Sequence, residues 1–307
     1  MNQEFFNELV QFMNEEQLKK DEPMKNHTTF RIGGPAMLYA SPVDEEQLAR
    51  LIKCVNQWQI PFFVLGNGSN LLVSDKGYQG VVIEIKDGFN HLSIEHKGDT
   101  ALVRAGAGIL LSKLAKAVAD ESLQGFEFAA GIPGTLGGAV TMNAGAYGGE
   151  IKEHIIRAKV ISREGELRYL TKEELNLSYR HSAIMSTGDI VVEAEFEFPN
   201  GVVSEIKEKM KDFNARRREK QPLEYPSAGS TFKRPEGYFA GKLIQDAGLR
   251  GFRIGDVMVS EKHCGFVVNV GEATAAQVKE LIDKVSEIVE EKFGVHLEPE
   301  VRFLGEF

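Results

Sequence analysis

The segment from Gly125 to Gly149 holds eight glycines in 25 residues, out of 31 glycines in a chain of 307 residues. Glycine loses more backbone freedom on folding than any other residue, so this density is unfavourable unless another group must approach the main chain closely. Ile132, Leu136 and Val140 are apolar, and they favour a packed segment over a mobile loop. We therefore expect a cradle for a large planar or diphosphate ligand.

A second glycine motif, Gly66-Asn67-Gly68-Ser69-Asn70, follows the apolar run 60–65, which is typical of a buried strand. The N–H groups of a tight turn at this place can hold a phosphate. A dinucleotide fingerprint would need a third glycine at position 71, followed by a helix. Leu71 stands there, and the short apolar run 71–73 does not resemble a helix. A simple turn remains the alternative to a phosphate loop.

Composition excludes several other classes of protein. The two cysteines, Cys54 and Cys264, cannot form a disulfide framework, and neither lies in a cluster with histidine that would hold a metal ion. A net charge of −9 is unsuitable for general nucleic-acid binding. The segment 237–243 is one residue too short for a P-loop. We find neither a signal-peptide pattern nor a run of 18 apolar residues, so we expect a cytoplasmic protein without membrane insertion.

Hydrophobic periodicity predicts a mixed set of helices and strands. The expected helices cover residues 44–58, 109–119, 203–220, 239–247 and 274–293. The expected strands cover residues 60–65, 81–85, 91–96, 102–107, 155–162, 166–170, 190–198, 256–260, 266–270 and 300–304. We expect 91–96 to pair with 102–107, and the turn at 163–165 (Arg-Glu-Gly) to join 155–162 and 166–170 in a hairpin. The strand 190–198 alternates apolar and acidic residues, so we expect it to be half-buried, and the break at 199–201 indicates a domain boundary.

Capping residues and apolar stripes refine these helices. Asp44 and Thr274 are expected N-caps, with Gln47 and Gln277 in the reciprocal position of a capping box. Gly294 should end the last helix. The stripe expected to face the core in the helix 109–119 is Leu110, Leu111, Leu114 and Val118. The stripe in the last helix is Val278, Leu281, Ile282, Val285, Ile288, Val289 and Phe293.

The strongest basic cluster is Arg216-Arg217-Arg218 together with Lys220. These cations can simply complement the dipole at a helix C-terminus. They can equally form a clamp for a diphosphate or carboxylate substrate. The sequence alone leaves both readings open.

The ordered motifs resemble the UDP-N-acetylenolpyruvoylglucosamine reductase family. The resemblance runs from 26–34 (Asn-His-Thr-Thr-Phe-Arg-Ile-Gly-Gly) to 300–303 (Glu-Val-Arg-Phe), and it includes 177–182 and 227–233. It implies an α+β protein with a vanillyl-alcohol-oxidase type FAD-binding fold of two subdomains, 1–85 and 86–199. An α+β substrate-binding domain, 200–307, would follow, with its C-terminal strand (about 299–305) returning toward the active site. The chain lacks the inserted loop of longer members, so it resembles the compact type II form.

The resemblance also implies roles for individual residues. Arg180, Ser230 and Glu300 match the catalytic positions. Tyr147, Lys220, Arg234 and Arg302 match substrate-contacting positions, and Arg234 stands where longer members usually have Asn. The positions that match FAD contacts are Gly66, Asn67, Gly68, Ser69, Asn70, Leu71, Gly131, Pro133, Gly134, Thr135, Gly138, Ala139, Asn143 and Gly145.

The implied reaction is the NADPH-dependent reduction of the enolpyruvyl group of UDP-N-acetylglucosamine enolpyruvate to UDP-N-acetylmuramate, a cytoplasmic step of peptidoglycan precursor synthesis. Arg180 would stabilise charge on the substrate carboxylate, a neutral Glu300 would share a hydrogen bond with it, and Ser230 would deliver a proton. FAD would be bound without a covalent link, because neither glycine segment contains His or Cys. Two alternatives remain: another flavin enzyme of this fold, and a nucleotide-binding module without catalysis.

Overall fold

The computed structural model describes residues 2–307, and these residues form two compact units. Unit 1 contains the residues up to Lys19, Leu38–Gly66 and Gly80–Arg216. Unit 2 contains Lys20–Met37, Asn67–Gln79 and Arg217–Phe307. Each unit has its own hydrophobic core. The three-part division with boundaries after residues 85 and 199 stays a prediction.

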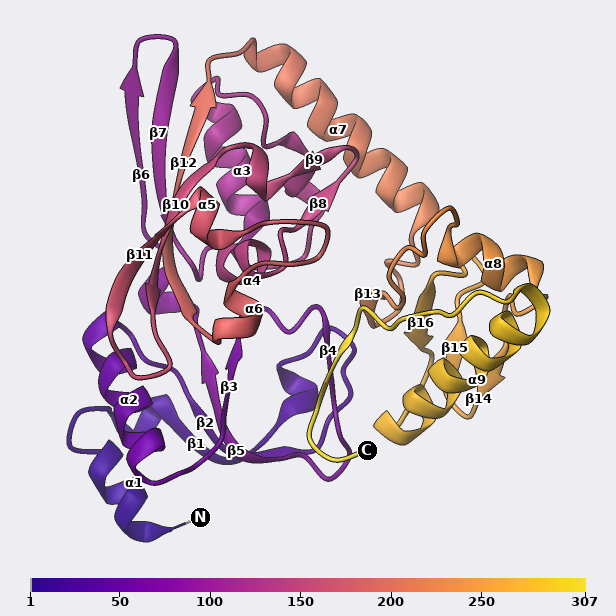
Figure 1. Cartoon of the computed structure of the whole chain (residues 1–307), viewed down its shortest axis with the longest axis horizontal. Helices are drawn as coiled ribbons and strands as arrows, with labels where there is room; N and C mark the ends of the chain where they lie inside the picture. Colours follow the sequence, from indigo (N-terminus) through magenta and orange to yellow (C-terminus); the bar gives the residue numbers. More distant parts are fainter. Residues whose placement is uncertain (1) are drawn as a thin grey trace. The chain divides into compact units, whose positions relative to one another are not determined.

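The main sheet of unit 1 has five strands in the order β11-β10-β12-β7-β6, with antiparallel neighbours (Figure 1). The strands are β6 (Leu92–Lys97), β7 (Thr100–Gly106), β10 (Ile155–Ile161), β11 (Leu167–Thr171) and β12 (Ile190–Pro199). Both predicted pairings, 91–96 with 102–107 and 155–162 with 166–170, are confirmed.

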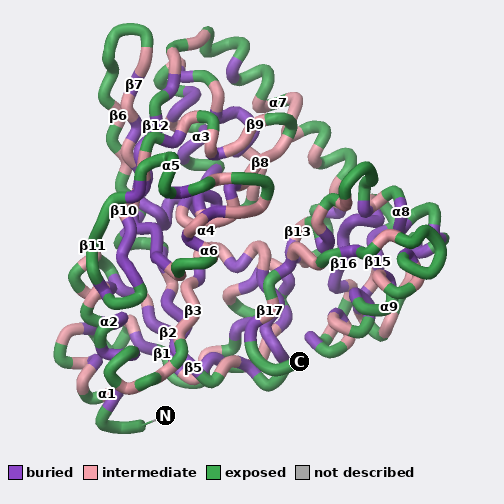
Figure 2. Tube along the Cα trace, in the orientation of Figure 1, coloured by how far each residue is buried: buried purple, intermediate pink, exposed green. Residues whose placement is uncertain are grey.

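The strand β12 is more buried than its alternating pattern predicted (Figure 2). Glu195 is only 6% exposed, and Arg157 Nη2 and Arg104 Nε donate to its Oε1 atom at 2.7 and 3.2 Å. Burial by itself would raise the pKa of Glu195, but the two arginine bonds hold that pKa below its usual value. An acidic residue is therefore buried here because it is paired.

The helices up to residue 220 are α1 (Gln3–Leu9), α2 (Glu45–Gln57), α3 (Leu111–Asp120), α4 (Leu136–Thr141), α5 (Lys172–Leu175), α6 (Ile184–Thr187) and α7 (Val203–Lys220). The Asp44 side chain accepts from Gln47 N at 2.8 Å, which confirms the predicted N-cap of α2. The prediction that Gln47 bonds back to Asp44 N in a capping box was wrong. The Gln47 Oε1 atom accepts from Val43 N and from Gln17 Nε2 instead. Leu110 was wrongly included in the stripe that faces the core, because it is the N-cap of α3 and only partly buried.

A four-stranded sheet has the order β1-β2-β5-β3. Its strands are β1 (Leu18–Pro23), β2 (Pro35–Ala40), β3 (Phe62–Leu65) and β5 (Tyr78–Glu84). The predicted strands at 60–65 and 81–85 are confirmed as the parallel pair β3 and β5. β1 was missed because its sequence, Leu-Lys-Lys-Asp-Glu-Pro, is mostly charged and largely exposed.

Unit 2 contains a sheet in the order β13-β16-β15-β14, with α9 against its β14 and β15 strands (Figure 1). Its elements are β13 (Ser227–Ser230), α8 (Ala240–Asp246), β14 (Arg253–Ile254), β15 (Val257–Val259), β16 (Phe266–Asn269) and α9 (Ala275–Phe293). The capping box of Thr274 and Gln277 and the end of α9 at Gly294 (φ +65°) are confirmed. Phe293 was wrongly placed in the core stripe: it is 40% exposed in the last turn of the helix.

The last strand, β17 (Arg302–Leu304), pairs in parallel with β4 (Leu71–Val73). The run after the first glycine motif is therefore a strand and not a helix, as predicted. Among the helices of residues 2–307, none combines the length and the apolar character needed to cross a membrane.

Candidate active site

The two glycine segments meet in unit 1 at Gly66 and Thr135. A Cβ atom at Gly66 would overlap the Thr135 Oγ1 atom, so this close approach requires glycine. Thr135 is 3% exposed and precedes the first residue of α4. Residues 66 and 135, both predicted to contact FAD, thus lie side by side.

Helix α4 contains two adjacent glycines with different surroundings. A Cβ atom at Gly137 would lie 3.0 Å from the Ala107 Cβ atom, so packing within the protein explains that glycine. At Gly138 the nearest atom among residues 2–307, outside its own helix and chain neighbours, would be Thr135 Oγ1 at 3.9 Å. The protein therefore leaves open space beside Gly138, which suits a cofactor that lies against the helix.

A short hairpin follows, formed by β8 (Gly145–Ala146) and β9 (Gly149–Glu150). Its two turn residues, Tyr147 (φ +54°) and Gly148 (φ +90°), both have the left-handed backbone of a type I′ turn. The Tyr147 ring stacks on Phe213 of α7, with centroids 4.5 Å apart and planes at 10°. Tyr147 is 41% exposed, so it can meet a ligand while Phe213 supports its other face.

Arg180 lies in the tight turn 178–181, which two backbone hydrogen bonds between Ser178 and His181 close at 3.1 Å each. Its φ is +53°, and its Nη2 atom lies 3.4 Å from the Gly145 carbonyl oxygen. The Asn143 side chain donates to the Ser178 carbonyl at 3.0 Å. Unit 1 therefore brings Arg180 together with Asn143 and the hairpin that carries Tyr147.

In unit 2 the remainder of the first glycine motif lies beside the C-terminal strand. Asn70 Nδ2 donates to the Glu300 carbonyl at 3.2 Å, and Arg302 N donates to the Asn70 carbonyl at 3.1 Å. Gly68 has φ +60°, and a Cβ atom there would overlap the His27 carbonyl oxygen. The Asn70 side chain thus joins a predicted cofactor residue to the main chain of the predicted catalytic residue Glu300.

Ser230 and Glu300 also lie close to each other in unit 2. Ser230 pairs with Phe266 at the end of β13, and the next residue, Thr231, accepts from Glu300 N at 2.8 Å. Ser230 is exposed, which leaves its hydroxyl available to a ligand. Ser230 and Glu300 belong to unit 2, whereas Arg180 belongs to unit 1.

Two basic residues predicted to contact the substrate, Lys220 and Arg234, belong to unit 2. Lys220 is exposed at the last residue of α7. The Arg234 guanidinium lies 4.0 Å from the centre of the Phe239 ring. Burial, and to a smaller extent the charge of Lys220, hold the pKa of His263 below its usual value, so this imidazole is uncharged at neutral pH. We singled out neither His263 nor Phe213 from the sequence, since a lone histidine or phenylalanine gives no functional signal.

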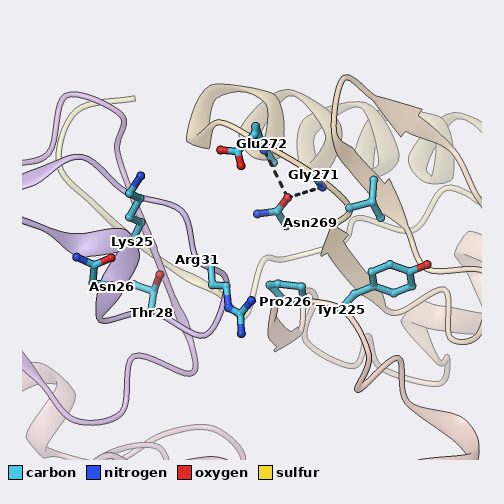
Figure 3. Close-up of a pocket in the computed structure, with 11 residues that line it drawn as sticks. Lys25, Asn26, Thr28, Arg31, Tyr225, Pro226, Asn269, Gly271 and Glu272 are labelled. Carbon is cyan, nitrogen blue, oxygen red and sulfur yellow. Dashed lines mark hydrogen bonds between the residues drawn. The ribbon is translucent and has the colours of Figure 1, made fainter.

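Unit 2 also contains a hollow of about 590 Å³, drawn in Figure 3. Lys25, Arg31, Tyr225, Asn269 and Glu272 are among the residues that line it. None of the predicted site residues is among them. In residues 2–307, no three His, Cys, Asp or Glu side chains gather in a way that could hold a metal ion.

Comparison with known proteins finds relatives along the whole chain. A family described as "FAD binding domain" matches residues 36–171, and one described as "UDP-N-acetylenolpyruvoylglucosamine reductase, C-terminal domain" matches residues 221–304. The UDP-N-acetylenolpyruvoylglucosamine reductase of Lachnoclostridium phytofermentans is 54% identical over 306 residues, covering 100% of this chain and 99% of the relative. That of Agathobacter rectalis is 54% identical over 315 residues and covers 100% of both chains.

The chain belongs to the UDP-N-acetylenolpyruvoylglucosamine reductase family. A crystal structure of this reductase from Thermus caldophilus superposes with a TM-score of 0.80 at 35% identity, covering 92% of this chain and 97% of the other. An alkyldihydroxyacetonephosphate synthase superposes with a TM-score of 0.50 at 18% identity, over 65% of this chain and 41% of that one, and shows the fold alone. The predicted α+β fold of FAD-binding oxidases is confirmed, as is the predicted enzyme class, an FAD-containing reductase of peptidoglycan precursor synthesis.

Proposed function

We propose that this chain uses NADPH to reduce UDP-N-acetylglucosamine enolpyruvate to UDP-N-acetylmuramate, and that it does so in the cytoplasm. The observation that carries the proposal is the position of Glu300, whose backbone bonds both to Asn70 of the first glycine motif and to Thr231, the neighbour of Ser230. FAD, when bound, supplies the hydride transfer between NADPH and the vinyl group. The residues of the chain then have to bind the substrate carboxylate and supply one proton.

We assign FAD binding to the two glycine segments. Gly66 and Thr135 touch each other, and Gly138 leaves open space beside α4, so the residues present suit a large cofactor. The other members of the proposed cofactor set are Asn67, Gly68, Ser69, Asn70, Leu71, Gly131, Pro133, Gly134, Ala139 and Gly145. Asn143, which was predicted with them, is fully buried, and its side-chain polar atoms are bonded within the protein.

We assign the substrate carboxylate to Arg180. A guanidinium can form two parallel hydrogen bonds to a carboxylate, and it stabilises the charge that develops there as hydride reaches the vinyl carbon. The closed turn at 178–181 supports this role because it holds Arg180 in one backbone conformation. Tyr147, Lys220, Arg234 and Arg302 are proposed as further substrate contacts.

We assign the proton to Ser230 and a supporting hydrogen bond to Glu300. Hydride addition to the terminal CH₂ carbon leaves an electron pair at the adjacent carbon, and a proton from the Ser230 hydroxyl completes the saturated product. A Glu300 carboxyl that stays protonated in its site can donate to the charged carboxylate group at the same time. The short connection from Glu300 through Thr231 to Ser230 supports this division of roles.

Ser230→Ala tests the proposal. Because the hydroxyl serves only the substrate carbon, NADPH should still reduce the flavin at close to the wild-type rate, and reoxidation by substrate should fall at least about a hundredfold. Stopped-flow absorbance of the flavin measures both half-reactions. Ser227→Ala, the same change in the same strand β13, is the matched control and should leave both rates near wild type.

Two results would contradict the assignment of Ser230. Equal losses in the two half-reactions would mean that Ser230 supports the flavin or the fold. Wild-type reoxidation in Ser230→Ala would mean that another group delivers the proton.

A further inference from the structure

Three residues with an unusual backbone lie in one small region of unit 1. Asn143 (φ +42°), Tyr147 (φ +54°) and Arg180 (φ +53°) have left-handed backbone conformations that residues other than glycine rarely adopt. Such conformations persist only where surrounding contacts hold them, and they gather at functional sites. Contacts with neighbouring residues must therefore hold Arg180 in this conformation.

The side chain of Asn143 is fully buried, and all its polar atoms have partners. Its Oδ1 atom accepts from Lys152 N at 3.0 Å, and its Nδ2 atom donates to Glu150 Oε2 and to the Ser178 carbonyl, each at 3.0 Å. A backbone N–H can only donate, so the bond from Lys152 fixes which end of the amide is oxygen. The Nδ2 group must then face Glu150 and Ser178.

Glu150 is the acceptor that completes this arrangement. Its carboxylate also pairs with Lys152 Nζ at 2.8 Å, and this bond is the main cause that holds the pKa of Glu150 below its usual value. The carboxylate is therefore charged at neutral pH and is a strong acceptor for the buried amide. Glu150 was not a candidate from the sequence.

The network reaches Arg180 through the main chain. Asn143 holds the Ser178 carbonyl, and Ser178 closes the turn that contains Arg180 through its two bonds with His181. On the other side, Glu150 lies opposite Gly145 in the hairpin, and the Gly145 carbonyl receives the Arg180 Nη2 bond. The Arg180 guanidinium therefore bonds to the hairpin directly, and the turn that carries Arg180 bonds to Asn143, which in turn donates to Glu150 of the hairpin.

We propose that Glu150 and Asn143 are positioning residues for Arg180, and that together they aim its guanidinium at the carboxylate of the enolpyruvyl substrate. The inference rests on the proposed function, in which Arg180 binds that carboxylate. Neither residue needs to touch the substrate for this role. Removing the acceptor at position 150 leaves one of the two N–H groups of the buried Asn143 amide without a partner, which loosens the hold of Asn143 on the turn of Arg180.

The experiment is a double-mutant cycle of Glu150→Ala and Arg180→Lys in the FAD-loaded protein. Glu150→Ala should slow reoxidation of the flavin by the enolpyruvyl substrate about tenfold and raise the KM of that substrate. The FAD content and the rate of flavin reduction by NADPH should stay unchanged. Glu150→Gln keeps an acceptor for Asn143 and should stay within about twofold of wild type. In the Arg180→Lys background, Glu150→Ala should add little. Glu153→Ala, an exposed glutamate three residues away, is the matched control and should have no effect.

The outcomes separate this inference from the proposed function. Wild-type reoxidation in Arg180→Lys would contradict the role of Arg180 itself. If Arg180→Lys slows reoxidation, and the rate loss in the double variant equals the product of the two single losses, only the positioning role of Glu150 is overturned. Equal losses in Glu150→Gln and Glu150→Ala would also overturn it, because charge and not the hydrogen bond would then matter. If Glu150→Ala loses FAD, Glu150→Asp replaces it in the cycle. The shorter aspartate side chain keeps the charge but moves the carboxylate away from the Asn143 amide.

Discussion

The first glycine motif and helix α4 both belong to the proposed FAD site, but they use glycine for different reasons. In the first motif, Gly66 and Gly68 are required by the protein itself, because a Cβ atom would overlap Thr135 Oγ1 or the His27 carbonyl oxygen. In α4, Gly137 packs on Ala107, whereas Gly138 has ordinary backbone angles and open space beside it. Gly138 is therefore the position whose missing side chain the protein does not explain.

This difference shows that glycine density alone does not mark a ligand site. Close packing between chain segments accounts for Gly66, Gly68 and Gly137 without any ligand. A glycine in a helix destabilises it relative to alanine by roughly 0.5–1 kcal/mol, so an unexplained helical glycine needs another reason. The space that it leaves for FAD is that reason in our account.

The largest effect on stability is expected for Gly68→Ala. The new methyl group would overlap the His27 carbonyl oxygen, and alanine is unfavourable at φ +60°. We expect a loss of about 3 kcal/mol in the free energy of unfolding. Urea denaturation followed by circular dichroism measures it. A wild-type midpoint would mean that the loop can move away from His27, and the packing explanation of this glycine would fail.

A smaller effect is expected for Gly66→Ala, because the overlap is with a side-chain atom and not with the main chain. The loss should be about 1–2 kcal/mol. Thr135→Ala removes the Oγ1 atom that causes the overlap, so the double variant Gly66→Ala/Thr135→Ala should recover most of that loss. Thermal unfolding of both single variants and the double variant checks this. Losses that simply add would show that Thr135 is not the obstacle.

The sequence predicted the elements whose signals are local. Helices α2 and α9 follow from their apolar periodicity and N-capping residues, and the β10–β11 hairpin follows from its turn. The charged strand β1 carried no such signal. The residues of unit 1 that hold Arg180 were also not predictable, because Asn143 and Ser178 are 35 positions apart and meet only in the folded chain.

The candidate site shows the same limit. The family motifs indicated Arg180, Ser230 and Glu300, but not that Glu300 would bond to Asn70 and Thr231, since parallel pairing of β17 with β4 is a long-range event. The sequence alone does not distinguish the roles of the adjacent glycines Gly137 and Gly138. Only the surroundings of their Cβ positions separate a packing role from a cofactor role.

Gly138→Ala tests the central claim most directly. Its methyl group would lie 3.9 Å from the nearest atom, so the apo protein should be as stable as wild type or more stable by about 0.5 kcal/mol. The affinity for FAD, measured by titration of the apo protein, should fall at least about tenfold, because the space for the cofactor is filled. Gly137→Ala is the matched neighbour, and its effect should fall on stability through Ala107. Wild-type FAD affinity in Gly138→Ala would contradict the account and leave this glycine without an explanation.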